Sequence, residues 1–427
     1  MSVANVLEVV KLEDLVDIRV SNVDKKRLPN EPTVKLCNYM DVYANDYIRA
    51  HNDFMIASAS IAEIEKFKVE VGDVLITKDS ETPFDIGIPS IVTDSIEGLV
   101  CGYHLALLKP DKSLIDSVYL AKQLGSNNTI AYYLKSASGS TRYGLSNGVI
   151  AKTPIPLLPL PSQKKIAKIS TTIDQLIEKT QALIDKYIAI KQGMMVDLFT
   201  RGIDLISGQL RSSVEQAPYL YKETELGWIP KGWDVDLVDN VLERIIDYRG
   251  KTPEKTETGV PLITAKNIKI GFVESEPREY ISSSSYDSWM TRGIPKLGDV
   301  LFTTEAPLAN VAQIEIDAKV AFAQRVIILR CNDRMNNDFL KYSLMSNDAR
   351  VRIFSKGSGS TVEGIKQSQF RKLSITFPVD IKEQSEINRM LNKLNYKINS
   401  ECSYLDKVLK MKSALMQDLL TGKIMVS

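Results

Sequence analysis

Residues 163–203, QKKIAKISTTIDQLIEKTQALIDKYIAIKQGMMVDLFTRGI, decide the fold, because residues 384–424 repeat their pattern. The two segments align without a gap at a constant offset of 221 residues. Both begin with a glutamine, and both end in Met-x-Asp-Leu-x-Thr-x-x-Ile. A duplicated unit predicts a pseudo-symmetric molecule whose two halves are free to diverge. Such a molecule suits an asymmetric target with two parts.

Apolar residues recur every three and four positions in both segments, which is the pattern of a coiled-coil seam. If Ile166 and Ile387 are each taken as position a, the expected seam runs along positions a and d, with Ile169 and Met390 as the first d residues. Polar breaks coincide at Thr180 with Glu401 and at Asp197 with Asp418. We therefore expect the two helices to pair with each other as an antiparallel coiled coil. The alternative is two ordinary core helices.

The length of these helices indicates a spacer. At about 1.5 Å per residue, a helix of this length would extend roughly 60 Å, which exceeds the interior of a compact domain. The helices are expected within 159–203 and 379–427, after mixed, β-rich domains at 1–158 and 227–378. The polar segment 204–226 is expected to be a linker between the halves. The fold class is thus α/β or α+β, with an internal pseudo-twofold repeat.

Two further elements recur in the mixed domains. Gly-Asp-Val-Leu begins a β-rich run at Gly72 and again at Gly298, and each run leads into a polar loop. Ser-Gly-Ser-Thr occurs at 138–141 and at 358–361. Backbone N–H groups and hydroxyls in such a loop suit phosphate oxygens, although most loops of this composition are merely turns.

Composition bounds the function. The 427 residues carry a net charge of +1, and each repeated helix segment carries +3, so a DNA-binding surface must be a local patch. Four dispersed cysteines without metal-ligand spacing indicate a reducing, cytoplasmic compartment. Neither a signal peptide nor a membrane-spanning run is apparent. The sequence has no P-loop and no Asn-Pro-Pro-Tyr motif, and its two histidines, His51 and His104, are expected to be structural or surface residues.

These features carry a family resemblance. The segment TELGWIPKGW at 224–233 resembles the start of a target-recognition domain in specificity subunits of type I restriction–modification systems. The Gly-Asp-Val-Leu strands, the Gly-Ser-Thr loops and a Gln-initiated helix ending in Asp-Leu-x-Thr-Gly, at 418–422, are also similar to that family. The order of domain, helix, domain, helix extends the resemblance over the whole chain. The first half departs from it, because it lacks the Gly-Trp-Ile-Pro opening.

The resemblance implies a non-catalytic DNA reader. Each recognition domain would read one half of a bipartite, asymmetric double-stranded DNA site, and the helices would set the gap. Two methylation subunits would dock on the helices, and restriction subunits with translocase activity would join them. The chain itself would bind no cofactor or metal, because S-adenosylmethionine, ATP and magnesium belong to the partner subunits. A protein-interaction scaffold built on a coiled-coil spacer, without DNA binding, is the alternative function.

Candidate contact residues follow from the chemistry that DNA requires. Bases are read by Arg, Lys, Asn or Gln, and phosphates are bound by cations, hydroxyls or backbone N–H groups. The DNA-binding candidates are Asn38, Tyr39, Lys78, Ser140, Thr141, Arg142, Tyr248, Arg249, Lys251, Lys266, Asn267, Thr304, Ser360 and Thr361. The candidates for docking partner subunits lie outside the expected seam and are Ile177, Ile184, Ile188, Phe199, Ile398, Leu405, Leu409 and Leu420.

Overall fold

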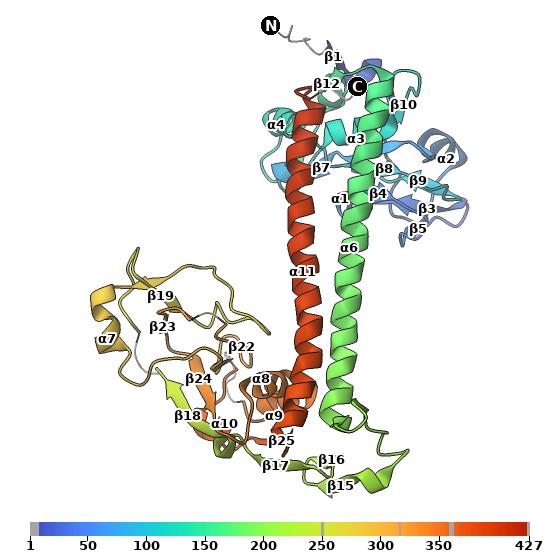
Figure 1. The fold of residues 1–427 in the computed structure, drawn as a ribbon. Coiled ribbons are helices and arrows are strands. Elements are labelled where there is room, and N and C mark those ends of the chain that lie inside the picture. Colours follow the sequence, from blue (N-terminus) through green and yellow to red (C-terminus); the bar gives the residue numbers. More distant parts are fainter. Residues whose placement is uncertain (1–7, 249–251, 316, 358–362, 425–427) are drawn as a thin grey trace. The chain divides into compact units, whose positions relative to one another are not determined.

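The computed structural model describes residues 8–248, 252–315, 317–357 and 363–424 (Figure 1). These residues form two compact units. The first contains the described residues up to Gln181 and those from Ser403 onward, and the second contains residues 182–402. Two long helices, α6 (Leu160–Arg201) and α11 (Ile381–Leu420), each contribute one part to each unit. Two mixed domains, each followed by a long helix, confirm the repeat expected from the sequence.

The first unit is built on a five-stranded sheet with the order β2-β10-β6-β8-β4. Its strands are β2 (Val16–Val20), β4 (Tyr47–Ile48), β6 (Val74–Thr77), β8 (Pro89–Val92) and β10 (Leu105–Pro110). A second sheet has the order β5-β3-β9, with β3 (Thr33–Cys37), β5 (Met55–Ser58) and β9 (Leu99–Cys101). The remaining pairs are β1 (Glu8–Lys11) with β12 (Pro154–Leu157), and β7 (Asp79–Ser80) with β11 (Tyr143–Gly144). The shorter helices are α1 (Tyr39–Tyr43), α2 (Ile61–Phe67), α3 (Ser117–Leu124), α4 (Asn127–Ser136) and α5 (Asn147–Ala151).

Both faces of the five-stranded sheet are buried, which explains the unbroken apolar runs in β6 and β10. Successive side chains in a strand point to opposite faces. Val74 and Ile76 accordingly pack in one hydrophobic cluster, whereas Leu75 packs in another. The first cluster includes Ile166 of α6 and Leu419 of α11, so it holds both long helices against the domain.

The described residues of the second unit repeat this topology, except that its main sheet has no strand at the place of β4. Its main sheet has the order β18-β24-β21-β22, and a smaller sheet has the order β20-β19-β23. The strands are β17 (Trp233–Leu237), β18 (Leu242–Asp247), β19 (Val260–Ile263), β20 (Tyr280–Ile281), β21 (Val300–Thr303), β22 (Val311–Gln313), β23 (Ala321–Phe322), β24 (Val326–Cys331) and β25 (Ser374–Pro378). The helices are α7 (Tyr286–Trp289), α8 (Asn337–Met345), α9 (Asn347–Ser355) and α10 (Gln367–Phe370). Strands β21 and β24 therefore correspond to β6 and β10.

The glutamine near the start of each long helix explains why the repeat begins there. Gln163 is fully buried; its side-chain carbonyl accepts from the Asp116 N–H at 2.8 Å, and its amide donates to the Leu158 carbonyl at 2.8 Å. Gln384 is also fully buried and makes the equivalent bonds, with the Asn336 N–H at 2.8 Å and the Pro378 carbonyl at 2.8 Å. Asp116 and Asn336 are the N-cap residues of α3 and α8. Gln163 thus fixes α6 to α3 in the first domain, and Gln384 fixes α11 to the equivalent helix, α8, in the second domain.

The buried stripe of the long helices differs from the expected seam at position d. The a positions Ile166 and Ile387 are buried as expected. At d, however, Leu176 and Ile190 are exposed on α6, and Tyr404 and Met411 are exposed on α11. The second row that faces inward falls at position e: Ile184, Leu198, Leu391 and Leu419 are buried, and Ile177, Ile398 and Leu405 are partly buried. The sequence did not reveal this choice, because both rows are largely apolar and either spacing of three and four residues satisfies the heptad.

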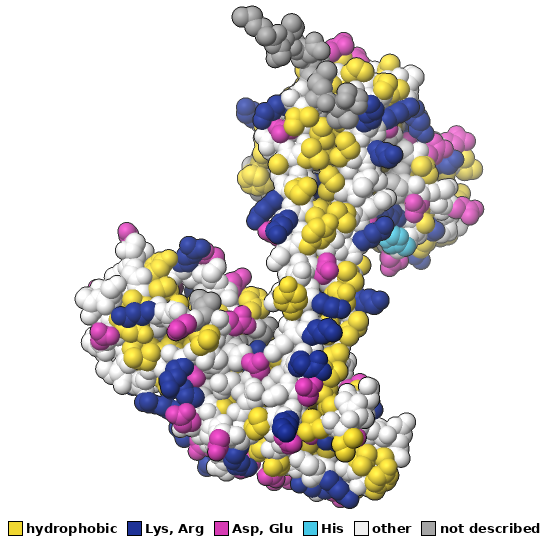
Figure 2. Space-filling model, in the orientation of Figure 1, with side chains coloured by type: hydrophobic (Ala, Val, Ile, Leu, Met, Phe, Trp, Pro, Cys, Tyr) yellow, Lys and Arg dark blue, Asp and Glu magenta, His cyan; other side chains and the backbone are white. Residues whose placement is uncertain are grey.

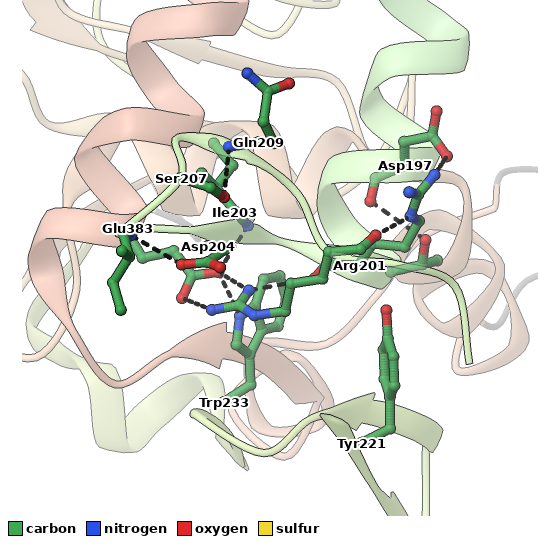
Figure 3. Close-up of polar contacts among 12 residues, drawn as sticks. Asp197, Arg201, Ile203, Asp204, Ser207, Gln209, Tyr221, Trp233 and Glu383 are labelled. Carbon is green, nitrogen blue, oxygen red and sulfur yellow. Dashed lines mark hydrogen bonds and ion pairs between the residues drawn. The ribbon is translucent and has the colours of Figure 1, made fainter. Parts of the chain in front are cut away.

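The segment after α6 is ordered by a buried carboxylate (Figure 3). Residues 203–230 form two hairpins, β13 (Ile203–Asp204) with β14 (Gln209–Leu210), and β15 (Tyr221–Thr224) with β16 (Gly227–Pro230). Glu383 Oε1 accepts from the Ile203 N–H at 3.0 Å and from Trp233 Nε1 at 2.9 Å, and Oε2 accepts from Arg211 Nη2 at 2.8 Å. Segment 204–226 is thus more structured than its aperiodic sequence indicated.

Candidate nucleic-acid interface

A polar junction forms where β6 ends in the first unit. The Lys78 N–H donates to the His104 carbonyl at 2.8 Å, and the Leu145 N–H donates to the Lys78 carbonyl at 2.9 Å. Residues 79–80 then pair with residues 143–144 as β7 and β11. The main chain therefore brings three distant segments together: the first repeated loop, the residue before β10, and the Ser-Gly-Ser-Thr loop.

The side chains at this junction form a chain of contacts from a carboxylate to a guanidinium. His104 Nδ1 lies 3.1 Å from Asp79 Oδ2, and Arg142 Nη2 lies 3.0 Å from His104 Nε2. Because a guanidinium is only a donor, Arg142 donates to Nε2, and Nδ1 then carries the proton that is donated to Asp79. Lys78 Nζ is 3.5 Å from the other oxygen of Asp79. We call Lys78, Asp79, His104 and Arg142 the first junction.

The second unit builds the same backbone arrangement with different side chains. The Thr304 N–H donates to the Arg325 carbonyl at 2.9 Å, and the Ile365 N–H donates to the Thr304 carbonyl at 2.9 Å. Arg325 Nε lies 3.0 Å from Glu305 Oε1. We call Thr304, Glu305 and Arg325 the second junction.

Glycines make both junctions possible. A Cβ on Gly144 would lie 2.7 Å from Asp79 Oδ1, and a Cβ on Gly364 would lie 3.0 Å from the Glu305 Cβ. Gly139 has a φ of +132°, and a Cβ there would lie 1.9 Å from the Arg142 carbonyl oxygen. The Gly-Ser-Thr loop of the first half is therefore a tight turn that only glycine permits, and it holds Arg142 beside β7.

The structure brings together several candidates from the first half. Lys78 and Arg142 meet in the first junction, and Ser140 and Thr141 lie exposed beside Arg142. The Tyr39 hydroxyl lies 3.3 Å from Ser80 Oγ, so this residue reaches the edge of the same region. Asn38 instead starts helix α1, where its N–H donates to Asp41 Oδ2 at 2.6 Å.

Three candidates from the second half are buried, which contradicts their expected place on the surface. Tyr248 stacks on Trp289 and donates its hydroxyl to the Gly293 carbonyl. The Asn267 side chain is used inside its own turn, where it accepts from the Thr264 N–H at 3.0 Å and donates to the Glu274 carbonyl. Thr304 is buried in the second junction. A polar sequence segment conceals such internal roles, because turn-forming and DNA-binding residues are of the same types.

The other candidates of the second half divide into two groups. Lys266 is exposed on the turn that Asn267 stabilises. Arg249, Lys251, Ser360 and Thr361 lie outside the described residues.

The docking candidates are affected by the shift of the buried stripe. Ile184 and Leu420 are buried, which contradicts their expected exposure. Phe199 packs against Phe339, and Ile177, Ile398 and Leu405 are partly buried. Ile188 and Leu409 are exposed, and they lie on the same helices as the exposed d residues. Figure 2 shows apolar and basic side chains exposed together along the long helices.

Sequence reasoning did not select Asp79, His104, Glu305 and Arg325, which the structure places in the two junctions. The offset of 221 residues that aligns the helices also places His104 on Arg325, so the signal was present. It was hidden because an acid paired with a base has no recognisable motif. Asp73 and Asp299, in contrast, have the expected structural role, because each binds a cation within its own sheet, Lys109 and Arg330, at 2.7 Å.

Two copies of one domain, each with a polar junction at the end of a central strand, define a duplicated recognition protein. The chain belongs to the type I restriction modification DNA specificity family, whose domain model matches residues 6–186 and again residues 238–408. It therefore carries the DNA-specificity domain twice. Among the described residues, no helix is both long and apolar enough to cross a membrane.

Individual relatives span most of this chain. The type I restriction enzyme MjaVIII specificity subunit of Methanocaldococcus jannaschii is 25% identical over 431 aligned positions, covering 97% of this chain and 94% of the relative. A protein of the same organism named as the MjaX specificity subunit is 26% identical and covers 85% of this chain and 81% of the relative. Among solved structures, an S subunit from M. genitalium matches with a TM-score of 0.59 at 12% identity over 98% of both chains. A chain from a structure of the assembling type I system matches with a TM-score of 0.53 at 15% identity, over 99% of this chain and 100% of that one. At these identities the structural matches support the fold.

Proposed function

We propose that this chain is the non-catalytic DNA reader of a type I restriction–modification complex, and that each of its domains reads one half of a bipartite, asymmetric double-stranded DNA site. The observation that carries the proposal is the pair of junctions, which share their backbone bonds but not their side chains. Identical scaffolds with unlike side chains are what two different half-sites require. A bare protein scaffold would not need two junctions with divergent charged groups.

The long helices act as the spacer in this proposal and run antiparallel as a coiled coil. Two contacts support this direction. In the first unit, Asp174 of α6 lies 2.6 Å from Lys412 near the end of α11. In the second unit, Lys397, in the first half of α11, lies over the ring of Tyr187, in the second half of α6, with 5.5 Å from its Nζ to the ring centroid. In both contacts, a residue from the first half of one helix lies beside a residue from the second half of the other.

The exposed apolar residues of the long helices are the proposed docking surface for two methylation subunits. They include Leu176, Ile188, Ile190, Tyr404, Leu409 and Met411. Large apolar side chains that are exposed on a helix surface mark an interaction site. The methylation subunits would supply S-adenosylmethionine and the adenine chemistry, and restriction subunits would supply ATP- and magnesium-dependent translocation and cleavage.

Methylation of a randomised duplex library tests the reading function. The chain is purified with its methylation partner, and methylated molecules are selected and sequenced. We expect two short conserved blocks of different sequence, separated by a gap of constant length. One contiguous block, or methylation without sequence preference, would contradict the proposal. The mass of the same complex tests its composition, because two methylation subunits per chain are expected, and one at saturating partner would contradict this.

A heptad insertion tests the spacer. Seven residues inserted between Thr180 and Tyr187 preserve the helix faces and lengthen α6 by about 10 Å at about 1.5 Å per residue. At about 3.4 Å per base pair, the gap should widen by roughly one to three base pairs, while the two blocks stay unchanged. An active variant with an unaltered gap would show that the helices do not set the spacing.

A further inference from the structure

The residue before the central strand β10 and its counterpart before β24 share a rare backbone conformation. His104 has a φ of 74° and Arg325 has a φ of 81°, and neither is a glycine. Left-handed backbone at a bulky residue is strained by roughly 1–3 kcal/mol and persists only where the surroundings impose it. Its occurrence at equivalent places in both domains indicates that both halves require a long polar side chain at this point.

Each of these side chains is tied to an acid, and each junction ends in an arginine. Glu305 contacts Nε of Arg325 directly. In the first junction, Asp79 contacts His104, which in turn accepts a hydrogen bond from Arg142. Arg142 is exposed, and Arg325 is about half exposed, whereas only 14% of the His104 side chain is accessible. The guanidinium of the first half, Arg142, is thus held by an imidazole, whereas that of the second half, Arg325, is held directly by a carboxylate.

A nearby carboxylate decides between the two kinds of DNA contact. Contact with a phosphate needs positive charge, which an adjacent acid partly cancels, and a lysine can also supply that charge. Contact with a base edge needs a guanidinium fork in a fixed orientation, which a charge-assisted bond provides. Arginine donating two parallel bonds to O6 and N7 of guanine is the commonest specific contact in the major groove.

We infer that Arg142 and Arg325 each read a guanine, one in each half of the bipartite site, and that His104 and Glu305 are positioning residues that orient them. This inference rests on the proposed function and names the residues through which it operates. The first half uses a relay of acid, imidazole and guanidinium, and the second half uses a direct acid–guanidinium pair.

The experiment compares lysine variants in the selection on randomised DNA. Arg325→Lys keeps the charge but loses the fork, so discrimination at one base pair of the second block should fall by about 10- to 100-fold. The first block should remain unchanged, which also shows that the variant folds. Arg142→Lys should lower discrimination at one base pair of the first block by a similar factor and leave the second block unchanged. Arg278→Lys, at an exposed arginine of the second domain paired with Glu276, is the matched control and should change neither block.

A glycine variant separates reading from backbone strain. His104→Gly suits the left-handed backbone and removes the imidazole, so it should lower discrimination at the same base pair as Arg142→Lys while leaving the unfolding midpoint unchanged or higher. A loss that is equal for all DNA sequences, or no loss in either lysine variant, would overturn the inference while leaving the proposed function intact. A wild-type complex without sequence preference would overturn the proposed function as well.

Discussion

The two units join their domains to the long helices at equivalent positions with different chemistry. In the first unit, Asp174 accepts from the Tyr47 hydroxyl at 2.6 Å and pairs with Lys122 at 2.8 Å and Lys412 at 2.6 Å. The repeat places Asn395 at the position of Asp174 in the second unit, where its amide donates to the Tyr342 hydroxyl. Lys191, which corresponds to Lys412, lies over the Tyr342 ring at 5.8 Å.

This difference shows which contacts are retained between the two copies of the domain and which contacts have diverged. The glutamine bonds at the helix starts are the same in both units, so the geometry of the scaffold is retained. The neighbouring contact between domain and helix differs. It is an ion-pair cluster around Asp174 in the first unit, and the Asn395 amide bond with the Lys191 cation–π contact in the second. Backbone-directed bonds therefore define the fold, and side chains around them are free to diverge.

The largest effect is expected in the second unit, from Glu383→Ala. This change leaves Arg211, the Trp233 indole N–H and the Ile203 N–H without their buried acceptor. Loss of one partner from a buried ion pair costs about 3–5 kcal/mol, and the hydrogen bonds to Glu383 also raise the pKa of Arg211. Denaturant unfolding should show this loss, whereas Glu386→Gln, at an exposed ion pair with Arg389, should leave the midpoint unchanged. Equal midpoints for the two variants would contradict a special role of the buried carboxylate.

The next effect tests the ion-pair anchor of the first unit. Asp174→Asn should destabilise by about 2–3 kcal/mol, because Lys122 and Lys412 lose a buried carboxylate but retain some solvent contact. Burial favours a higher pKa for Asp174, but Lys122, Lys412 and Tyr47 outweigh it, so the pKa lies below the ordinary value of 3.8.

The pH dependence of stability follows from that direction. A carboxylate with a lowered pKa contributes stability that is fully present above the unfolded pKa and is lost as the pH falls through the folded pKa. The stability difference between wild type and Asp174→Asn should therefore be constant near neutrality and shrink only below about pH 4. A difference that persists undiminished at pH 2 would show that packing, and not the charge, stabilises this site.

The third prediction concerns the glutamine hydrogen bonds that occur in equivalent form within each unit. Gln163→Ala and Gln384→Ala each leave one backbone N–H and one buried carbonyl without their glutamine partner, so each should cost about 1–3 kcal/mol. Because the two environments correspond bond for bond, we expect the two losses to agree within about 0.5 kcal/mol. Unfolding of both single variants measures this, and a cost confined to one of them would break the correspondence.

The smallest effect on stability is expected on the outer helix surface. Ile190→Ser and Leu409→Ser change exposed side chains, so stability should remain within about 0.5 kcal/mol. Binding of the methylation subunit should nevertheless weaken, as measured by titration of the partner. Lys410→Ser, at an exposed position on the same helix as Leu409, is the control. Unchanged partner affinity in both apolar variants would remove this surface from the docking proposal.

Periodicity and repetition predicted the fold well because they report directly on burial and duplication. Helices α6 and α11 span 42 and 40 residues and lie within the segments 159–203 and 379–427. The seam failed at position d, because Leu176 and Leu198 are equally apolar and only the packing distinguishes them. The network around Glu383 could not be predicted, since it joins residues separated by up to 180 positions.

The candidate site was predicted less completely, for a physical reason. Lys78 and Arg142, which were chosen because both lie in repeated loops, both lie in the first junction. Tyr248 and Asn267 were misplaced, because the polarity of a segment does not show which of its side chains turn inward. His104 and Arg325 are separated from their acidic partners by about 20 residues or more, and only the strand pairing brings them together.

Exchange of one recognition domain tests the central claim most directly. Residues 227–378 are replaced by the corresponding segment of a relative, and methylated sites of the hybrid complex are mapped on the randomised library. Because each unit has its own core and its own junction, we expect one block of the site to change completely while the other block is retained. A change in both blocks would contradict the account, because it would mean that the two domains read DNA jointly.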